Sequence, residues 1–178
     1  MTYDEMLDYA IDCGFERAAI IETSEIVFDP SFRKFCEQNT CGNYNANYSC
    51  PPVCGTPEEM KAKVLAHSKA LVYQSTFRDM SGSEMGMRIA KMKHGKMAVD
   101  LVRRMVAEDH VGFQIGANAC DVCPSCVKEE GGSCKYPDRR FSCLSAYCID
   151  CAKLAATCGM PFYFCDDEVS FYGLYVFD

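Results

Sequence analysis

The apolar pattern of the N-terminal residues predicts a helix followed by a short strand. Residues 3–13 carry apolar side chains at helical spacing, and Gly14 follows as a stop signal. The apolar run 18–21 predicts a buried strand, which we expect to continue towards Phe28. Pro30 then breaks the pattern, so the chain is expected to leave this strand in a loop.

Helix and strand signals continue to alternate in the middle of the chain. Thr56, Pro57 and Glu59 together are typical of a capped helix start, and we expect this helix to end near His67. Residues 70–77 predict a second strand. This alternation favours a sheet covered by helices.

A long amphipathic helix is predicted after the second strand. It is opened by Ser81 or Ser83 and extends to about Glu108. Its apolar residues recur at helical spacing, and we expect this stripe to face the core. The stripe consists of Met85, Ile89, Met92, Val99, Val102 and Val106. Residues 111–117 predict a third strand.

The C-terminal part of the chain predicts one more helix and a hairpin. Residues 142–157 have a helical apolar spacing, and Gly159 follows as a stop signal. The segments 161–164 and 169–177 predict two strands, with residues 165–168 as the turn between them. The chain therefore ends in the sheet.

Two segments, 36–55 and 120–141, lack both helical and strand periodicity but are rich in cysteine. Loops of this length are unusual inside a compact domain unless they are functional or held by something. No linker or repeat divides the chain. We therefore expect residues 1–178 to form a single domain, an α/β or α+β sandwich with a mixed β-sheet, helices and these two cysteine-rich loops.

The cysteine content indicates the chemistry of the protein and the compartment in which we expect it. Cysteine occupies 14 of the 178 positions, near the level of a disulfide or metal scaffold. A chain of this length buries enough surface to fold without covalent staples. The acidic N-terminal segment 1–5 lacks the features of a secretory signal. We therefore expect a reducing, cytoplasmic location in a prokaryote, and so many oxidisable thiols indicate an anaerobe.

Charge and hydropathy exclude two classes of partner. Eighteen basic and 25 acidic side chains give a net charge of −7, which argues against nucleic-acid binding. No apolar run approaches the ~20 residues of a membrane helix. In a reducing compartment, clustered cysteines are metal ligands or catalytic thiols.

The strongest cysteine motif lies in the second loop and comprises Cys120, Cys123, Cys126 and Cys134. The repeated Cys-x2-Cys spacing places three sulfurs around a common point. Structural zinc sites use two separated knuckles, whereas a continuous run with a fourth cysteine further on is typical of a cubane cluster. We expect a [4Fe–4S] cluster here, and zinc or a metal-free loop are the alternatives.

A second candidate site lies in the first loop and comprises Cys36, Cys41, Cys50 and Cys54. Pro51 favours an extended Cys50 and makes a rigid corner. The asparagines and the glycine of this loop tolerate unusual backbone angles. Three of the cysteines could hold a cubane with one iron open to a substrate, and Cys54 could close it. The alternative is a loop with buried free thiols.

Both loops carry residues in a specific order. The first contains FCEQNTCGNY at 35–44 and YSCPP at 48–52, and the second contains CDVCPSC at 120–126, CKYP at 134–137 and SCLSAY at 142–147. In this order and separation, they resemble a family of small prokaryotic cysteine-rich proteins described only as predicted metal-binding. The resemblance spans nearly the whole chain and implies no reaction. It implies metal binding through Cys36, Cys41, Cys50, Cys120, Cys123, Cys126 and Cys134.

Seven cysteines lie outside the set that the resemblance implies. They are Cys13, Cys54, Cys143, Cys148, Cys151, Cys158 and Cys165. The spacing of Cys143, Cys148 and Cys151 copies part of a plant-type ferredoxin motif. However, Leu144, Cys148, Cys151, Ala155 and Cys158 recur at helical spacing. We therefore interpret this group as core side chains of a helix, because buried cysteine packs as a small apolar residue.

Basic and histidine side chains are weaker indications of function than the cysteine motifs. The segment 88–104 is locally basic, which suits either a solvated helix face or a docking surface for an acidic redox partner such as a flavoprotein or a ferredoxin. Arg139 and Arg140 either offset the charge of a cluster or lie on the surface. The three histidines are interpreted as structural or exposed. They are His67, His94 and His110.

These observations favour a cytoplasmic iron–sulfur protein with an electron-transfer role, one cluster in the second loop and a second one possible in the first. Two other functions remain open. One is an enzyme that uses an open iron of the first loop, and the other is a zinc-stabilised binding module. The opening helix–Gly14–Phe15–strand layout also suggests a corrinoid or flavin site, by fold analogy alone.

Overall fold

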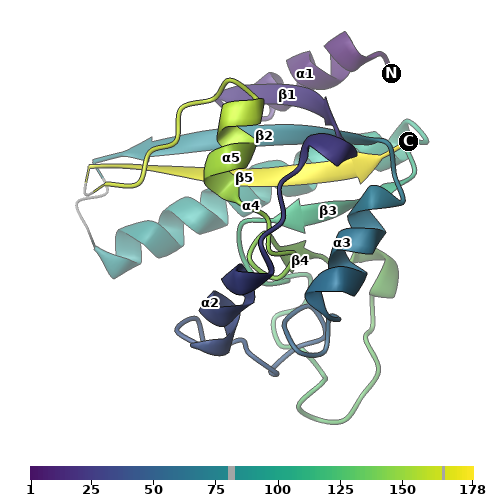
Figure 1. Cartoon of the computed structure of the whole chain (residues 1–178), viewed down its shortest axis with the longest axis vertical. Coiled ribbons are helices and arrows are strands. Elements are labelled where there is room, and N and C mark those ends of the chain that lie inside the picture. Colours follow the sequence, from purple (N-terminus) through teal and green to yellow (C-terminus); the bar gives the residue numbers. More distant parts are fainter. Residues whose placement is uncertain (80–82, 166) are drawn as a thin grey trace.

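One mixed β-sheet forms the centre of the protein (Figure 1). A computed structural model describes residues 1–79, 83–165 and 167–178. Within them the strand order is β1-β2-β5-β3-β4. All neighbouring strands are antiparallel except β3 and β4, which are parallel. The strands are β1 (Arg17–Glu22), β2 (Lys69–Arg78), β3 (Gly112–Gly116), β4 (Ser142–Cys143) and β5 (Glu168–Phe177).

Helices cover both faces of this sheet. α1 and α4 pack against one face, where Met6 and Leu101 meet Tyr73 and Tyr175 in one apolar cluster. α3 and α5 cover the other face, and they lie in front of the sheet in Figure 1. The α-helices of the described residues are α1 (Tyr3–Asp12), α2 (Arg33–Glu37), α3 (Pro57–Leu65), α4 (Glu84–Ala107) and α5 (Cys151–Thr157). The expected α/β sandwich with a mixed sheet is confirmed.

Helix starts were predictable because they depend on neighbouring residues. Thr56 and Glu59 form a reciprocal capping box with Pro57 in the first turn of α3. The hydroxyl of Ser83 accepts a hydrogen bond from the backbone amide of Gly86 at 2.9 Å, and thereby caps α4. Ser81, the other expected start, lies outside the described residues. The predicted starts of α3 and α4 are thus confirmed.

The expected buried stripe of α4 is wrong. Four of its six residues are exposed, and Met85 and Met92 are 65% and 71% accessible. The face that packs on the sheet instead carries Ala90, His94, Ala98, Leu101 and Met105. This face also repeats every three to four residues, and it includes two alanines, Ala90 and Ala98. Hydropathy alone ranked the larger methionine and valine residues above these alanines.

The predicted helix over 142–157 is correct only in its second half. Cys148 has a backbone φ of 57°, which a right-handed helix cannot contain. The side chain of Asp150 accepts a hydrogen bond from the Lys153 amide and starts α5 after this break. Residues 142–143 instead form β4 and pair with β3. The helical spacing of apolar residues continues through this turn because the side chains of the turn are also buried, so the spacing did not reveal the break.

Three smaller expectations also need correction. β1 ends at Glu22 and does not continue to Phe28, which forms only an isolated bridge with Ile149. The first cysteine loop is preceded by α2, whose last residues reach into the range 36–55. Phe164 pairs with Val169 through a single bridge, so 161–164 is not a full strand. Asp166 of the expected hairpin turn lies outside the described residues.

The long helix α4 packs against one face of the sheet. None of the described helices is both long and apolar enough to cross one.

Candidate metal centre

The two cysteine loops lie side by side below the sheet (Figure 1). The hydroxyl of Tyr48 in the first loop donates a hydrogen bond to the carbonyl of Gly132 in the second. The ammonium of Lys128 in the second loop donates to the side-chain oxygen of Asn45 at 3.1 Å. The two loops therefore support each other, and each forms part of the other's surroundings.

The four cysteines of the second loop share one cavity. Cys120, Cys123, Cys126 and Cys134 all line a space of about 40 Å³, and all four are partly buried. Residues 47–49 of the first loop close one side of this space. The sequence spacing predicted that these thiols meet, and the structure places them around one space. Their role as ligands remains a prediction.

The donor set of this cavity suits a thiolate-bound metal. Soft sulfur ligands select zinc, copper(I) or iron–sulfur clusters. Lys135 and Arg140 also line the cavity and supply positive charge beside the thiols, and no carboxylate does so among the described residues. Within the described residues, no three His, Cys, Asp or Glu side chains lie close enough together to hold a single metal ion.

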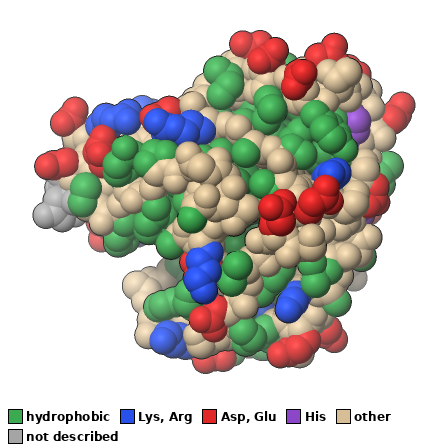
Figure 2. Space-filling view, turned by 45° about the horizontal axis from the view of Figure 1, so that its top comes forward, with side chains coloured by type: hydrophobic (Ala, Val, Ile, Leu, Met, Phe, Trp, Pro, Cys, Tyr) green, Lys and Arg blue, Asp and Glu red, His purple; other side chains and the backbone are tan. Residues whose placement is uncertain are grey.

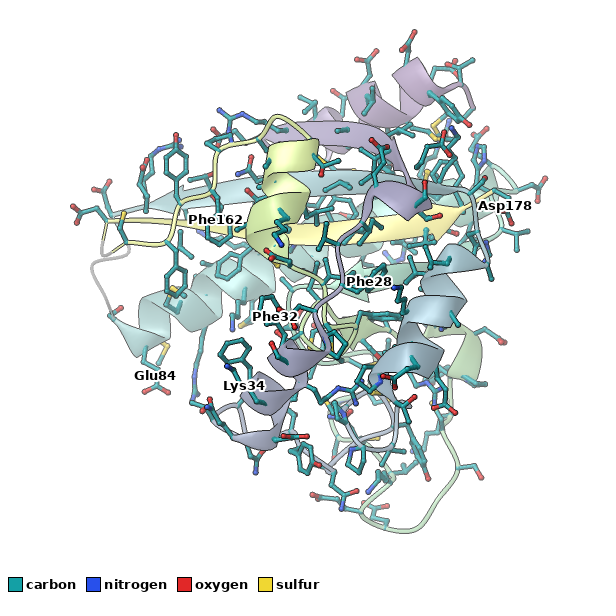
Figure 3. The ribbon with its side chains drawn as sticks, viewed as in Figure 1. Phe28, Phe32, Lys34, Glu84, Phe162 and Asp178 are labelled. Atoms are coloured by element: carbon teal, nitrogen blue, oxygen red, sulfur yellow. The ribbon has the colours of Figure 1, made fainter. Side chains whose placement is uncertain are left out.

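A larger cleft of about 790 Å³ lies between the first loop and the start of α4. Figure 2 shows the surface indented between the left arm of the molecule and its lower part. Figure 3 shows Glu84 at the outer end of α4, to the left of Phe32, which precedes α2, and of Lys34 in α2. The cleft is lined by Cys36, Cys41 and Cys50, as the sequence grouped them. Cys54 is not among the residues that line it.

The fourth cysteine of the cleft is Cys143, at the end of β4. Hydrogen bonding from the Cys36 thiol, and then from nearby backbone amides, lowers the pKa of Cys143. Burial raises the pKa of Cys50 to about 12. Sequence reasoning missed Cys143 because it placed this residue inside a helix.

The backbone of the first loop depends on its asparagines and glycine. Asn39, Gly42 and Asn45 have positive φ angles of 52°, 74° and 58°, which the sequence predicted for these residue types. The side-chain oxygen of Asn47 accepts a hydrogen bond from the Ser49 amide at 2.9 Å. These short-range contacts curl the loop so that its cysteines face the cleft.

A buried arginine ties this loop to the sheet edge. The guanidinium of Arg33 donates one hydrogen bond to the carbonyl of Gly55 and one to that of Ala146, each at 2.8 Å. Gly55 is the last residue of the first loop, and Ala146 lies three residues after Cys143. Arg33 is only 8% exposed. It therefore fixes the position of the two segments that supply thiols to the cleft.

The remaining cysteines have the surroundings of core or surface residues. Cys148 is 1% exposed, and Cys151 and Cys158 pack against the main apolar cluster. Burial raises the pKa of Cys151 to about 12 and that of Cys158 to about 11. Cys165 is exposed. The interpretation of Cys148, Cys151 and Cys158 as core side chains agrees with this packing.

Of the two arginines singled out in the sequence, one lies at the second-loop cavity, and two of the histidines make polar contacts elsewhere. His94 is buried with its Nδ1 atom 2.6 Å from the Ser75 hydroxyl, and His67 lies 3.0 Å from the Asp178 carboxylate. Arg140 lines the second-loop cavity, whereas Arg139 lies over the ring of Tyr136. Of these two arginines, only Arg140 therefore lies beside the thiols, where a cation can offset the charge of a cluster.

The fold and its two groups of thiols define a single-domain α/β protein of the cysteine-rich metal-binding class. A family model described as "Predicted metal-binding protein (DUF2284)" matches residues 19–177, and the chain belongs to this family. No curated protein and no solved structure matches the chain. The family description agrees with the resemblance seen in the sequence and names neither the metal nor a reaction.

Proposed function

We propose that the protein carries electrons through a [4Fe–4S] cluster bound by Cys120, Cys123, Cys126 and Cys134. The observation that supports this proposal is the shared cavity, which these four thiols line together. When bound, such a cluster supplies a one-electron redox centre. The chain's own residues hold it, separate it from solvent and balance its charge. The proposal also requires a reducing compartment, such as the cytoplasm of an anaerobe.

Several residues are placed to tune such a centre. Asn47, Tyr48 and Ser49 cover one side of the cavity, so they limit the access of water to the sulfurs. Arg140 places a cation beside the thiols. Solvent exposure, nearby charge and hydrogen bonds to sulfur set the reduction potential of iron–sulfur centres. The first loop thus contributes to the second-loop site without supplying a ligand to it.

Metal analysis after anaerobic purification tests this proposal. We expect iron and acid-labile sulfide in about equal amounts, and a broad visible absorption that dithionite bleaches and air-free oxidant restores. The reduced protein should give an EPR signal. Zinc at about one ion per chain without sulfide would contradict the proposal and favour a zinc-stabilised module.

We further propose that an acidic redox protein docks on α4. Its exposed face carries Arg88, Lys91, Lys93 and Lys96 on a chain of net charge −7, and exposed apolar side chains lie between them. Arg88 and Lys91 also line the cleft of the first loop. Complementary charge steers partners and raises association rates. A partner on this face would lie next to the thiols.

Charge reversal on α4 tests the docking proposal. The double variant Lys93→Glu and Lys96→Glu leaves the cleft lining unchanged. Its second-order rate of reduction by a reduced bacterial ferredoxin, used as an acidic probe, should fall roughly 10-fold at low salt and little at high salt. The matched control is Lys61→Glu with Lys153→Glu, on the exposed surfaces of α3 and α5 across the sheet. Equal rates for both double variants would contradict the proposal.

A further inference from the structure

We propose that Cys36, Cys41, Cys50 and Cys143 form a second iron–sulfur cluster site, in which Cys143 is the ligand that completes the set. All four thiols line the cleft between the first loop and α4. Three of them come from one continuous segment, and the fourth comes from the far edge of the sheet. This site adds a second centre to the proposed electron-transfer function, but its four residues are separate from those of the first.

The sheet fixes the position of Cys143. β4 pairs in parallel with β3, and Cys143 lies opposite Gly116 in the register. The chain then folds back at once, because the amide of Leu144 donates to the Gly116 carbonyl and that of Ala146 donates to the Cys143 carbonyl. Cys143 is therefore the last residue of a strand, held at the point where the sheet edge meets the first loop.

The turn after Cys143 belongs to the wall of the cleft. The Ala146 amide donates to the Cys143 carbonyl and closes the turn, and Ser145 inside it lines the cleft together with Cys143. Groups around a bound cluster offset the charge of its thiolates. Arg33 adds a buried cation nearby, and its hydrogen bond to Ala146 holds the same turn.

Cys54, which the sequence suggested as the closing ligand, has different surroundings. Both Cys54 and Cys143 pack against the main apolar cluster, but only Cys143 lines the cleft. The spacing of Cys54 from Cys50 made it the natural candidate, because distance along the chain was the only measure that the sequence offered. The fold brings Cys143 to the cleft instead, through a strand pairing that no local pattern records.

The two proposed sites share a wall. Residues 47–49 line the cavity of the second loop, and the next two residues, Cys50 and Pro51, line the cleft of the first. A short piece of backbone therefore lies between the two groups of thiols. Adjacent centres allow electrons to pass between clusters. This arrangement connects the exposed cleft near α4 with the more enclosed second-loop cavity.

Iron counting on reconstituted variants tests the site. After anaerobic reconstitution with ferrous iron and sulfide, two clusters give about eight irons per chain and one gives about four. We expect about eight for the unchanged protein, for Cys54→Ala and for the control Cys158→Ala. Cys143→Ala should bring the count to about four. Full iron in Cys143→Ala together with loss in Cys54→Ala would overturn the assignment.

A second-loop variant separates this inference from the proposed function. In a chain with Cys120→Ala and Cys123→Ala, about four irons should remain, and adding Cys143→Ala should remove them. If the count of the unchanged protein is about four and Cys120→Ala with Cys123→Ala abolishes it, the second site is wrong and the proposed function stands. If iron depends on Cys143 but not on Cys120 and Cys123, the opposite holds.

Alkylation of the unchanged protein avoids any effect of substitution on folding. Loaded protein and chelated protein are treated with iodoacetamide, and each cysteine is followed by mass spectrometry. Cys36 and Cys143 should be protected in the loaded form and modified after chelation, while Cys158 reacts alike in both. Equal modification of Cys143 in the two forms would overturn the proposal even if all variants misfold.

Discussion

Removal of the metal is expected to expose both cysteine loops to proteases while the sheet stays folded. Described residues 38–56 and 117–136 contain turns but neither helix nor strand, so backbone pairing does little to hold them. Ordering each such residue costs about 1–2 kcal/mol, and metal binding to thiolates offsets costs of this size in small metal domains. The sheet has its own apolar clusters on both faces and does not need the metal.

Two proteases report on the two loops separately. Trypsin sites occur in the second loop at Lys128, Lys135, Arg139 and Arg140, and the first loop, 36–55, contains none. Chymotrypsin can cut the first loop at Tyr44 and Tyr48. Cleavage at these sites should be about 100-fold faster in the chelated protein, as expected when bound metal contributes about 2.7 kcal/mol of protection.

The control for this experiment lies on α4. Lys93 and Lys96 are exposed trypsin sites inside a long helix that packs on the sheet, and their cleavage should be slow in both forms. Far-UV circular dichroism should change little on chelation. Equal cleavage of the loops with and without metal would show that the protein chain orders them unaided. Rapid cleavage at Lys93 would instead show that the whole domain unfolds.

Features set by neighbouring residues were predictable from the sequence. The capping boxes of α1 and α3 need only a threonine and a glutamate three residues later. The strand β5 contains the apolar run 171–177, because both of its faces are covered and it lies between β2 and β3. The four second-loop cysteines were grouped for the same reason, since their spacing is short and regular.

Features set by contacts distant in the sequence were not predictable. Which face of α4 is buried depends on how closely the helix lies on the sheet, and this favours Ala90 and Ala98 over Met92. The position of Cys143 depends on the pairing of a strand of two residues with β3. Periodicity cannot detect a strand this short. The sequence pattern therefore placed Cys143, which completes the proposed first-loop site, inside a predicted helix.

Replacing Arg33 should both destabilise the protein and weaken the first-loop site. Arg33→Ala removes the hydrogen bonds to the carbonyls of Gly55 and Ala146 and leaves both carbonyls without that donor. A buried polar group left unpaired costs about 1–3 kcal/mol, so two of them should lower the free energy of unfolding by roughly 2–6 kcal/mol. Urea denaturation of the chelated protein measures this loss without a contribution from metal.

The effect on metal binding follows from the same two contacts. Arg33 holds the turn that follows Cys143 and the end of the first loop, and its charge opposes the rise that the Cys143 thiol and burial cause in the pKa of Cys36. Without it, the thiols of the cleft lose both their alignment and a nearby cation. Iron at the first-loop site should be lost from Arg33→Ala under conditions where the second-loop site stays loaded.

Two further variants make the Arg33 prediction specific. Arg33→Lys keeps the charge, but an ammonium lacks the planar fork that reaches two carbonyls at once, so we expect an intermediate loss of stability. Lys34→Ala changes the exposed neighbour on α2 and should alter the unfolding free energy by less than about 0.5 kcal/mol. The prediction is wrong if Arg33→Ala is as stable as Lys34→Ala and binds as much iron. Arg33 would then not position the first-loop site, and the loop backbone alone would hold the thiols of α2 and β4.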